Sequence, residues 1–230
     1  MLKKISAAIL SASLLASPVF ASDSHEGGNE IAQVKAIVKN LLEDNGSFVK
    51  SHNPEYFKPF VDGQKPRATV VTCSDSRVHT HALDKTPDSD LFMVRNIGNQ
   101  LSTAEGSIEY GVHHLHTPLL IFVGHSVCGA VKAASGDYAS LSAPIKRELD
   151  TMHVTKGGDT MENVKTNVHN QVGDAMKKFD AEVKEGKLVV MGAVYDFRND
   201  LKQGQGKLVI ININGEQDQK KLEKSPLISG

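Results

Sequence analysis

The chain has 230 residues, of which 40% are hydrophobic and 23% charged, and its formal net charge is −1. This composition is ordinary for a globular protein and is sufficient for one substantial domain or two small ones. The near-neutral charge excludes the extended basic surface that nucleic-acid-binding proteins carry. Beyond the first twenty or so residues, no apolar run is long enough to span a membrane.

The first 21 residues have the organisation of a secretory signal peptide. Lys3 and Lys4 form a basic start, residues 5–16 form an apolar run, and Ala21 supplies the small side chain that precedes a cleavage site. The apolar run is short and interrupted by serines, which favours a cleaved signal over an anchor helix. Cleavage would leave residues 22–230 as a single domain with a net charge of −3, in the periplasm or outside the cell.

The remaining chain alternates between strand and helix patterns, which indicates an α/β fold with a mostly parallel sheet of about five strands flanked by helices. We expect strands at about 68–73, 90–96, 119–123, 187–195 and 207–213, with the last two forming a hairpin. We expect helices at 30–43, ended by Asn45-Gly46; at 102–116, opened by a capping box; at 127–136; and within 139–183, interrupted at Pro144 and at 157–158. The first of these helices would form an N-terminal arm.

Reactive side chains follow two of the predicted strands, at the point where each strand ends. Cys73 and Asp75 come at the end of the strand at 68–73, and His125 and Cys128 follow the strand at 119–123. In parallel α/β sheets ligands bind at the carboxyl ends of the strands. We therefore expect these four side chains to form one site.

Two interpretations of the cysteines are open. Two cysteines in an exported protein would commonly form a disulfide. Zinc prefers thiolate and imidazole ligands, and Cys73, His125 and Cys128 would supply three of them and leave a fourth position free for catalysis. We favour the metal, because a disulfide gives no role to His125 or Asp75.

Asp75 and Arg77 lie on the same side of an extended backbone, two residues apart. Arg77 can hold the carboxylate through a paired contact, which would keep Asp75 off the metal. Without Arg77, Asp75 could itself be the fourth zinc ligand and close the site.

Three segments together resemble the β-class carbonic anhydrases: Cys73–Val78, Arg95–Asn99 and Gly124–Gly129. The similarity extends from about residue 41 to residue 196. The resemblance implies zinc held by Cys73, His125 and Cys128, and an Asp75–Arg77 dyad that orients zinc-bound hydroxide. It also implies the reversible hydration of carbon dioxide to bicarbonate and a proton.

The resemblance further indicates the open-site subclass of that family. Gln64, Phe92 and Tyr110 stand at the spacing of its substrate-pocket residues, and Gly129 follows the last ligand. The gated subclass usually has a tryptophan where this chain has Val70, and the chain contains no tryptophan. The segment His79-Thr-His81 departs from the family, which often has a proline there, and export is also less usual.

The resemblance implies a homodimer or a dimer of dimers, with the N-terminal helix reaching across the partner. Two other functions stay open on sequence grounds. Relatives of this fold hydrolyse carbon disulfide or carbonyl sulfide, and the same residues could form a non-catalytic zinc site in an exported protein.

Overall fold

The computed structural model describes residues 30–229, so the predicted signal peptide lies outside the described residues. The chain divides into two compact units, with the boundary between Lys58 and Pro59. The prediction of a single domain over 22–230 therefore stays a prediction. Within 30–229, no helix has both the length and the apolar character needed to cross a membrane.

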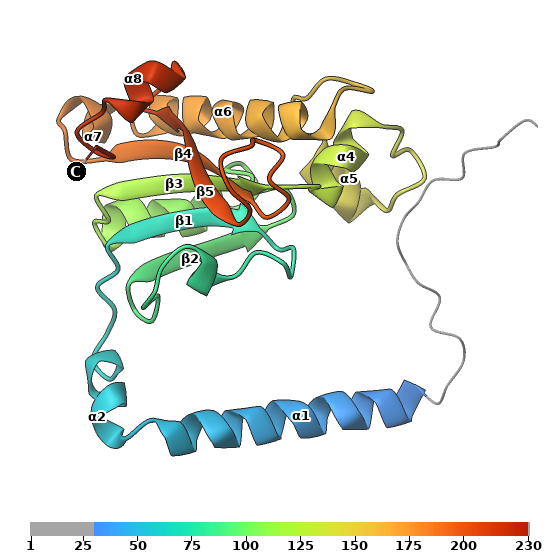
Figure 1. Cartoon of the computed structure of the whole chain (residues 1–230), viewed down its shortest axis with the longest axis vertical. Coiled ribbons are helices and arrows are strands. Elements are labelled where there is room, and N and C mark those ends of the chain that lie inside the picture. The colour runs from blue at the N-terminus through green and yellow to red at the C-terminus, as the bar shows by residue number, and fades with distance from the viewer. Residues whose placement is uncertain (1–29, 230) are drawn as a thin grey trace, which may run out of the picture. The chain divides into compact units, whose positions relative to one another are not determined.

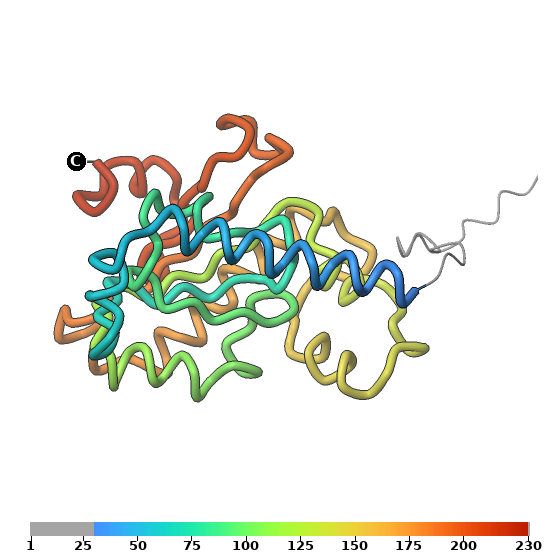
Figure 2. Tube along the Cα trace, turned by 90° about the horizontal axis from the view of Figure 1, so that it is seen from below, coloured from blue at the N-terminus to red at the C-terminus, as the bar shows by residue number. Residues whose placement is uncertain are grey.

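The sheet lies entirely in the second unit. Its strands are β1 (Ala68–Cys73), β2 (Leu91–Asn96), β3 (Leu119–His125), β4 (Val189–Asp196) and β5 (Lys207–Ile213). Their order is β2-β1-β3-β4-β5. The first four are parallel, and β5 pairs with β4 in the antiparallel direction, as the predicted hairpin requires. The connection between β4 and β5 forms a loop that extends from the sheet unit (Figure 2).

Helices account for most of the remaining structure. They are α1 (Glu30–Ser51), α2 (Pro54–Phe57), α3 (Glu105–Glu109), α4 (Gly129–Ser135), α5 (Ala143–Leu149), α6 (Thr160–Lys178), α7 (Asp180–Lys184) and α8 (Gln219–Glu223). Short 3₁₀ turns occupy Lys58–Phe60 and Thr80–Ala82, and a π-helical turn occupies Tyr110–His114. The predicted fold class, including the N-terminal helix, is confirmed.

The long helix α6 lies along β3 and β4 on one face of the sheet (Figure 1). It approaches closely because β3 carries Gly124: a Cβ there would lie 2.8 Å from side-chain carbons of Val164 and Val168. Both valines are fully buried. On the other face, alternate residues of the same strands form a second cluster with Leu222 of α8. The sheet is thus buried on both sides, which explains the continuous apolar runs of its strands.

The strand order reverses between β1 and β3. The chain leaves β1 for β2 on one side, and then crosses to β3 on the other side of β1. Such a switch point opens a crevice at the carboxyl ends of the strands, where the two connections diverge. The fold therefore predicts a site beside Cys73 and His125, the last residues of β1 and β3.

Two local predictions are wrong. Asn45-Gly46 does not end the first helix, which continues to Ser51. A glycine within a helix costs only about 1 kcal/mol, and the helix ends where Asn53 and Pro54 begin α2. There is no capping box at Ser102: α3 begins at Glu105, and its preceding residue makes no side-chain cap.

Candidate metal centre

The two strand ends bring three metal-binding side chains together. β1 and β3 are paired in parallel, with Thr72 opposite Val123, so Cys73 and His125 lie at the same edge of the sheet. Cys128 follows after a short turn and precedes α4. The donor atoms of Cys73, His125 and Cys128 all lie within 4.8 Å of one another. The three side chains are 4%, 0% and 1% exposed, so the cluster is shielded from bulk water.

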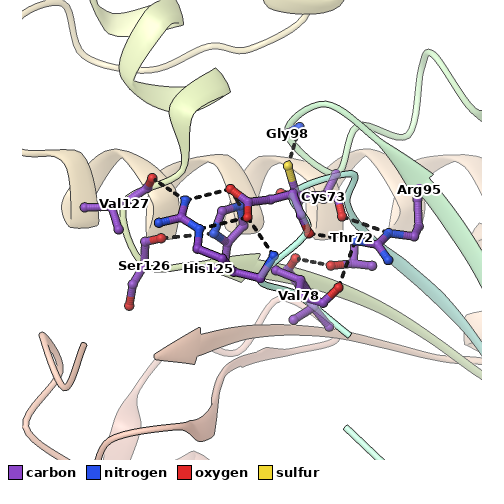
Figure 3. Close-up of polar contacts among 12 residues, drawn as sticks. Thr72, Cys73, Val78, Arg95, Gly98, His125, Ser126 and Val127 are labelled. Carbon is purple, nitrogen blue, oxygen red and sulfur yellow. Dashed lines mark hydrogen bonds and ion pairs between the residues drawn. The ribbon is translucent and has the colours of Figure 1, made fainter. Parts of the chain in front are cut away.

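The turn between His125 and Cys128 is strained. Val127 has φ +47°, in the left-handed region that a β-branched residue rarely adopts. This conformation costs about 1–2 kcal/mol. It directs the Val127 carbonyl oxygen toward Arg77, whose Nη2 donates to it at 3.3 Å (Figure 3).

His125 has the tautomer of a metal ligand. Its Nδ1 lies 3.0 Å from the carbonyl oxygen of Ser126, which can only accept, so Nδ1 carries the proton. Its Nε2 therefore presents a lone pair, and this atom is buried without a hydrogen-bond partner. A buried imidazole nitrogen without a hydrogen-bond partner, close to two cysteine side chains, is an arrangement that fits a metal ion.

The cysteines are free thiols rather than a disulfide. A hydrogen bond from the Cys128 thiol lowers the pKa of Cys73 to about 4, and the same contact raises the pKa of Cys128. The backbone N–H of Gly98 also donates to Cys73 Sγ at 3.4 Å. Two buried thiols beside an imidazole nitrogen that lacks a hydrogen-bond partner are a donor set suited to zinc, which displaces thiol protons on binding.

Asp75 is held beside this cluster by Arg77. Arg77 Nε donates to Asp75 Oδ1 at 2.9 Å and Nη2 donates to Oδ2 at 2.6 Å. This hydrogen bonding lowers the pKa of Asp75 to about 2, so its side chain is an acceptor near neutral pH. Asp75 Oδ2 lies 3.9 Å from His125 Nε2. Arg77 itself packs over the Phe197 ring, with Cζ 5.0 Å from the ring centroid.

Arg95 has a role that its position in the sequence does not predict. Its Nε donates to the carbonyl oxygen of Cys73 at 3.1 Å, and its Nη2 donates at 2.8 Å to those of Asp75 and Val78 (Figure 3). Arg95 thus fixes the loop that carries both Cys73 and Asp75. The signal in the sequence that could have indicated this role is that Arg95 begins the Arg95–Asn99 segment. Phe197 was not predicted either; its ring stacks on that of His125, with the ring centroids 6.1 Å apart.

The predicted substrate-pocket residues lie in different places. Gly129 begins α4 directly after Cys128. Phe92 and Tyr110 contact each other, with ring centroids 5.8 Å apart. Phe92 pairs with Thr69, four residues before Cys73, which is about 13 Å along the strand. Gln64 is exposed and lines a surface pocket with Phe60, Gly63 and Ser89. Their part in substrate binding stays a prediction.

The fold and the cluster together define a class of protein: a mostly parallel α/β protein with a buried Cys–His–Cys cluster that could hold a metal ion at the switch point of its sheet. Residues 68–202, more than half of the chain, match the family described as carbonic anhydrase. The chain therefore belongs to the carbonic anhydrase family.

Individual relatives agree with this membership. Carbonic anhydrase 2 of Mycobacterium tuberculosis is 40% identical over 104 residues, which are 42% of this chain and 50% of that protein. A carbonic anhydrase of Synechococcus elongatus is 34% identical over 106 residues, 43% of this chain and 39% of that protein. The chain thus spans about half the length, or less, of these curated relatives.

Solved structures share the fold. A tetrameric β-carbonic anhydrase of Sordaria macrospora superposes with a TM-score of 0.65 at 23% identity, covering 77% of this chain and 98% of that one. The Coccomyxa β-carbonic anhydrase, solved with acetazolamide, gives a TM-score of 0.62 at 23% identity, covering 80% and 90% of the two chains.

Proposed function

We propose that this protein is a zinc-dependent carbonic anhydrase that interconverts carbon dioxide and water with bicarbonate and a proton. One observation carries the proposal: a buried Cys73–His125–Cys128 cluster, with an unpartnered imidazole nitrogen, lies beside a carboxylate that Arg77 holds in place. Membership of the carbonic anhydrase family supports it.

Cys73, His125 and Cys128 would hold the zinc ion. When bound, zinc would supply Lewis acidity that lowers the pKa of water and makes a nucleophile available near neutral pH. Asp75, ionised because Arg77 lowers its pKa, would accept a hydrogen bond from that water and fix the direction of its remaining lone pairs.

Arg77 would have two functions in this reaction. It occupies both oxygens of Asp75, which favours the open-site subclass over a carboxylate bound to the metal. The Arg77 side chain is 48% exposed, so its positive charge would also be available to stabilise the negative charge of the forming bicarbonate. We assign Gln64, Phe92, Tyr110 and Gly129 to substrate contacts on the basis of their spacing.

We further propose that the protein is a homodimer or a dimer of dimers. The apolar residues of α1 support this, since eight of them are between 41% and 69% exposed: Ile31, Val34, Ile37, Val38, Leu41, Leu42, Phe48 and Val49. The Sordaria macrospora relatives with the same fold are tetrameric.

We also propose that the protein is exported, on the basis of residues 1–21. N-terminal sequencing of the exported protein should then give Ser22 as its first residue.

Stopped-flow measurement of carbon dioxide hydration, with zinc determined on the same sample, tests the activity. We expect one zinc per chain and rapid hydration, and we expect Cys128→Ser to lose both. Wild-type zinc binding without hydration, or with hydrolysis of carbon disulfide or carbonyl sulfide instead, would contradict the proposed reaction. Wild-type activity in Cys128→Ser would contradict the proposed metal site.

A further inference from the structure

The hydrogen bond from Gly98 to Cys73 depends on an unusual backbone position. Gly98 has φ +80°, and a Cβ at this residue would lie 2.1 Å from the Cε atom of Met152. The positive φ favours glycine, because residues with a Cβ rarely adopt it, and a Cβ here would also displace the end of the Met152 side chain. Glycine is also flexible, so a fixed N–H direction at residue 98 requires support from outside the loop.

Three buried amide side chains supply that support. We call Gln100, Asn167 and Gln171 the amide network; they are 0%, 1% and 4% exposed. Asn167 Nδ2 donates to the Gly98 carbonyl oxygen at 2.9 Å, and Gln100 Nε2 donates to the same oxygen. Gln171 Oε1 accepts from the backbone N–H of Leu101 at 2.7 Å. The network thus holds the loop on both sides of Gln100.

The members of the network also fix one another. Gln100 Nε2 donates to Asn167 Oδ1 at 2.8 Å, and Gln171 Nε2 donates to Gln100 Oε1 at 3.1 Å. From the end of β2, Asn96 Oδ1 accepts from the Gln100 N–H at 2.8 Å, and Asn96 Nδ2 donates to the Gln100 carbonyl at 2.7 Å. Because each of these amides both donates and accepts, flipping any one of them would break several bonds.

The network occupies a face of α6 that could have been apolar. Asn167 and Gln171 are one helical turn apart, next to the buried residues Val168 and Val172. Buried amides give no more stability than well-packed apolar side chains, and they cost free energy whenever a partner is missing. A role in placing the Gly98 N–H accounts for their presence.

We propose that the amide network positions the metal centre: Asn167 holds Gly98 directly and Gln171 holds it through Gln100, so that the Gly98 N–H donates to Cys73 Sγ and tunes this sulfur as a zinc ligand. The inference rests on the proposed function, because it assumes that the cluster binds zinc. Groups that hydrogen-bond to metal ligands typically change metal affinity or activity by about 10- to 100-fold. Asn167 and Gln171 would be positioning residues acting through Gly98.

The test compares Asn167→Leu with Asn163→Leu. Asn163 is equally buried on α6, one turn away, but its amide bonds to Thr155 rather than to the Gly98 loop. Gln171→Met, which preserves side-chain length, is a second test variant should Asn167→Leu not fold. For each folded protein we would measure zinc affinity by competition with a chelator, and the thiolate-to-cobalt charge-transfer absorption of the Co²⁺-substituted form.

We expect Asn167→Leu and Gln171→Met to weaken zinc binding by about 10- to 100-fold. We also expect their thiolate-to-cobalt charge-transfer band to move to longer wavelength. A thiolate that loses a hydrogen bond transfers an electron to the metal at lower energy. Asn163→Leu should keep the wild-type band and affinity even if its melting temperature falls. An unchanged band and affinity in folded Gln171→Met, or equal changes in Asn163→Leu, would overturn the inference. A wild-type protein that binds no zinc would instead overturn the proposed function.

Discussion

Asp75 and Arg77 form a two-point ion pair whose carboxylate end lies 3.9 Å from the unpartnered nitrogen of His125. Arg95 donates to the backbone carbonyl oxygens of Asp75 and Val78, and so holds the backbone on both sides of Arg77. The Asp75 carboxylate is thus largely buried beside the Cys–His–Cys cluster, unlike the fully exposed salt bridges that contribute little to stability.

Replacing Asp75 by Asn should reduce the turnover of carbon dioxide hydration by about 100-fold or more, because an oriented acceptor at the reacting water is lost. Zinc content should stay close to one per chain, since Asp75 is not among the three donors. Stopped-flow kinetics and metal analysis on the same sample would measure both.

The matched control for this variant is Asp90→Asn. Arg67 donates to both carboxylate oxygens of Asp90, which forms a second two-point ion pair. Arg67 directly precedes β1 and Asp90 directly precedes β2, so this pair lies at the amino ends of the strands, opposite the metal centre. Its loss should leave turnover unchanged. Equal turnover in wild type and Asp75→Asn would contradict the role of the dyad.

The depressed pKa of Asp75 predicts how stability depends on pH. Arg77 lowers this pKa from 3.8 to about 2, so folding favours the ionised form. The resulting stabilisation is fully present above pH 3.8 and is lost as the pH falls through 2. It amounts to about 2 kcal/mol.

Urea unfolding of the zinc-free protein at several pH values would measure this term. The free energy of unfolding of the wild type, minus that of Asp75→Asn, should be constant above about pH 5 and decrease below pH 3.8. A difference that does not change between pH 5 and pH 2 would show that the ion pair does not contribute in solution.

The left-handed backbone at Val127 predicts a stabilising substitution. Val127→Asn should raise the free energy of unfolding by about 1 kcal/mol, because asparagine adopts positive φ more readily than valine. Chemical denaturation would measure the change. The control is Val61→Asn: Val61 is 76% exposed and has no positive φ, and its replacement should have little effect. Destabilisation by Val127→Asn beyond that of the control would contradict the assignment of strain.

The exposed apolar residues of α1 predict self-association. Replacing Leu41 and Leu42 together by Glu should lower the mass measured by light scattering after size-exclusion chromatography, since charges would enter an apolar interface. Lys35→Glu changes the charge of the same helix without altering this apolar set, and its mass should match the wild type. An unchanged mass in the Leu41, Leu42 variant would exclude α1 from the interface.

The sequence by itself determined the secondary structure around the metal centre and the identity of its donors. The apolar runs that end in Cys73 and just before His125 are local patterns, and the rule that parallel strands align their carboxyl ends requires no further information. For that reason the five-stranded sheet and the Cys–His–Cys cluster could both be predicted and were both found.

Only the tertiary structure decided what surrounds those donors. Gln171 reaches Gln100 across 71 positions of the chain, and Arg95 reaches Cys73 across 22. Such bonds depend on the register of α6 and β2 against the rest of the fold, which no local pattern encodes. Periodicity is a property of neighbouring residues, whereas the bonds that orient a metal ligand are set by packing between distant ones.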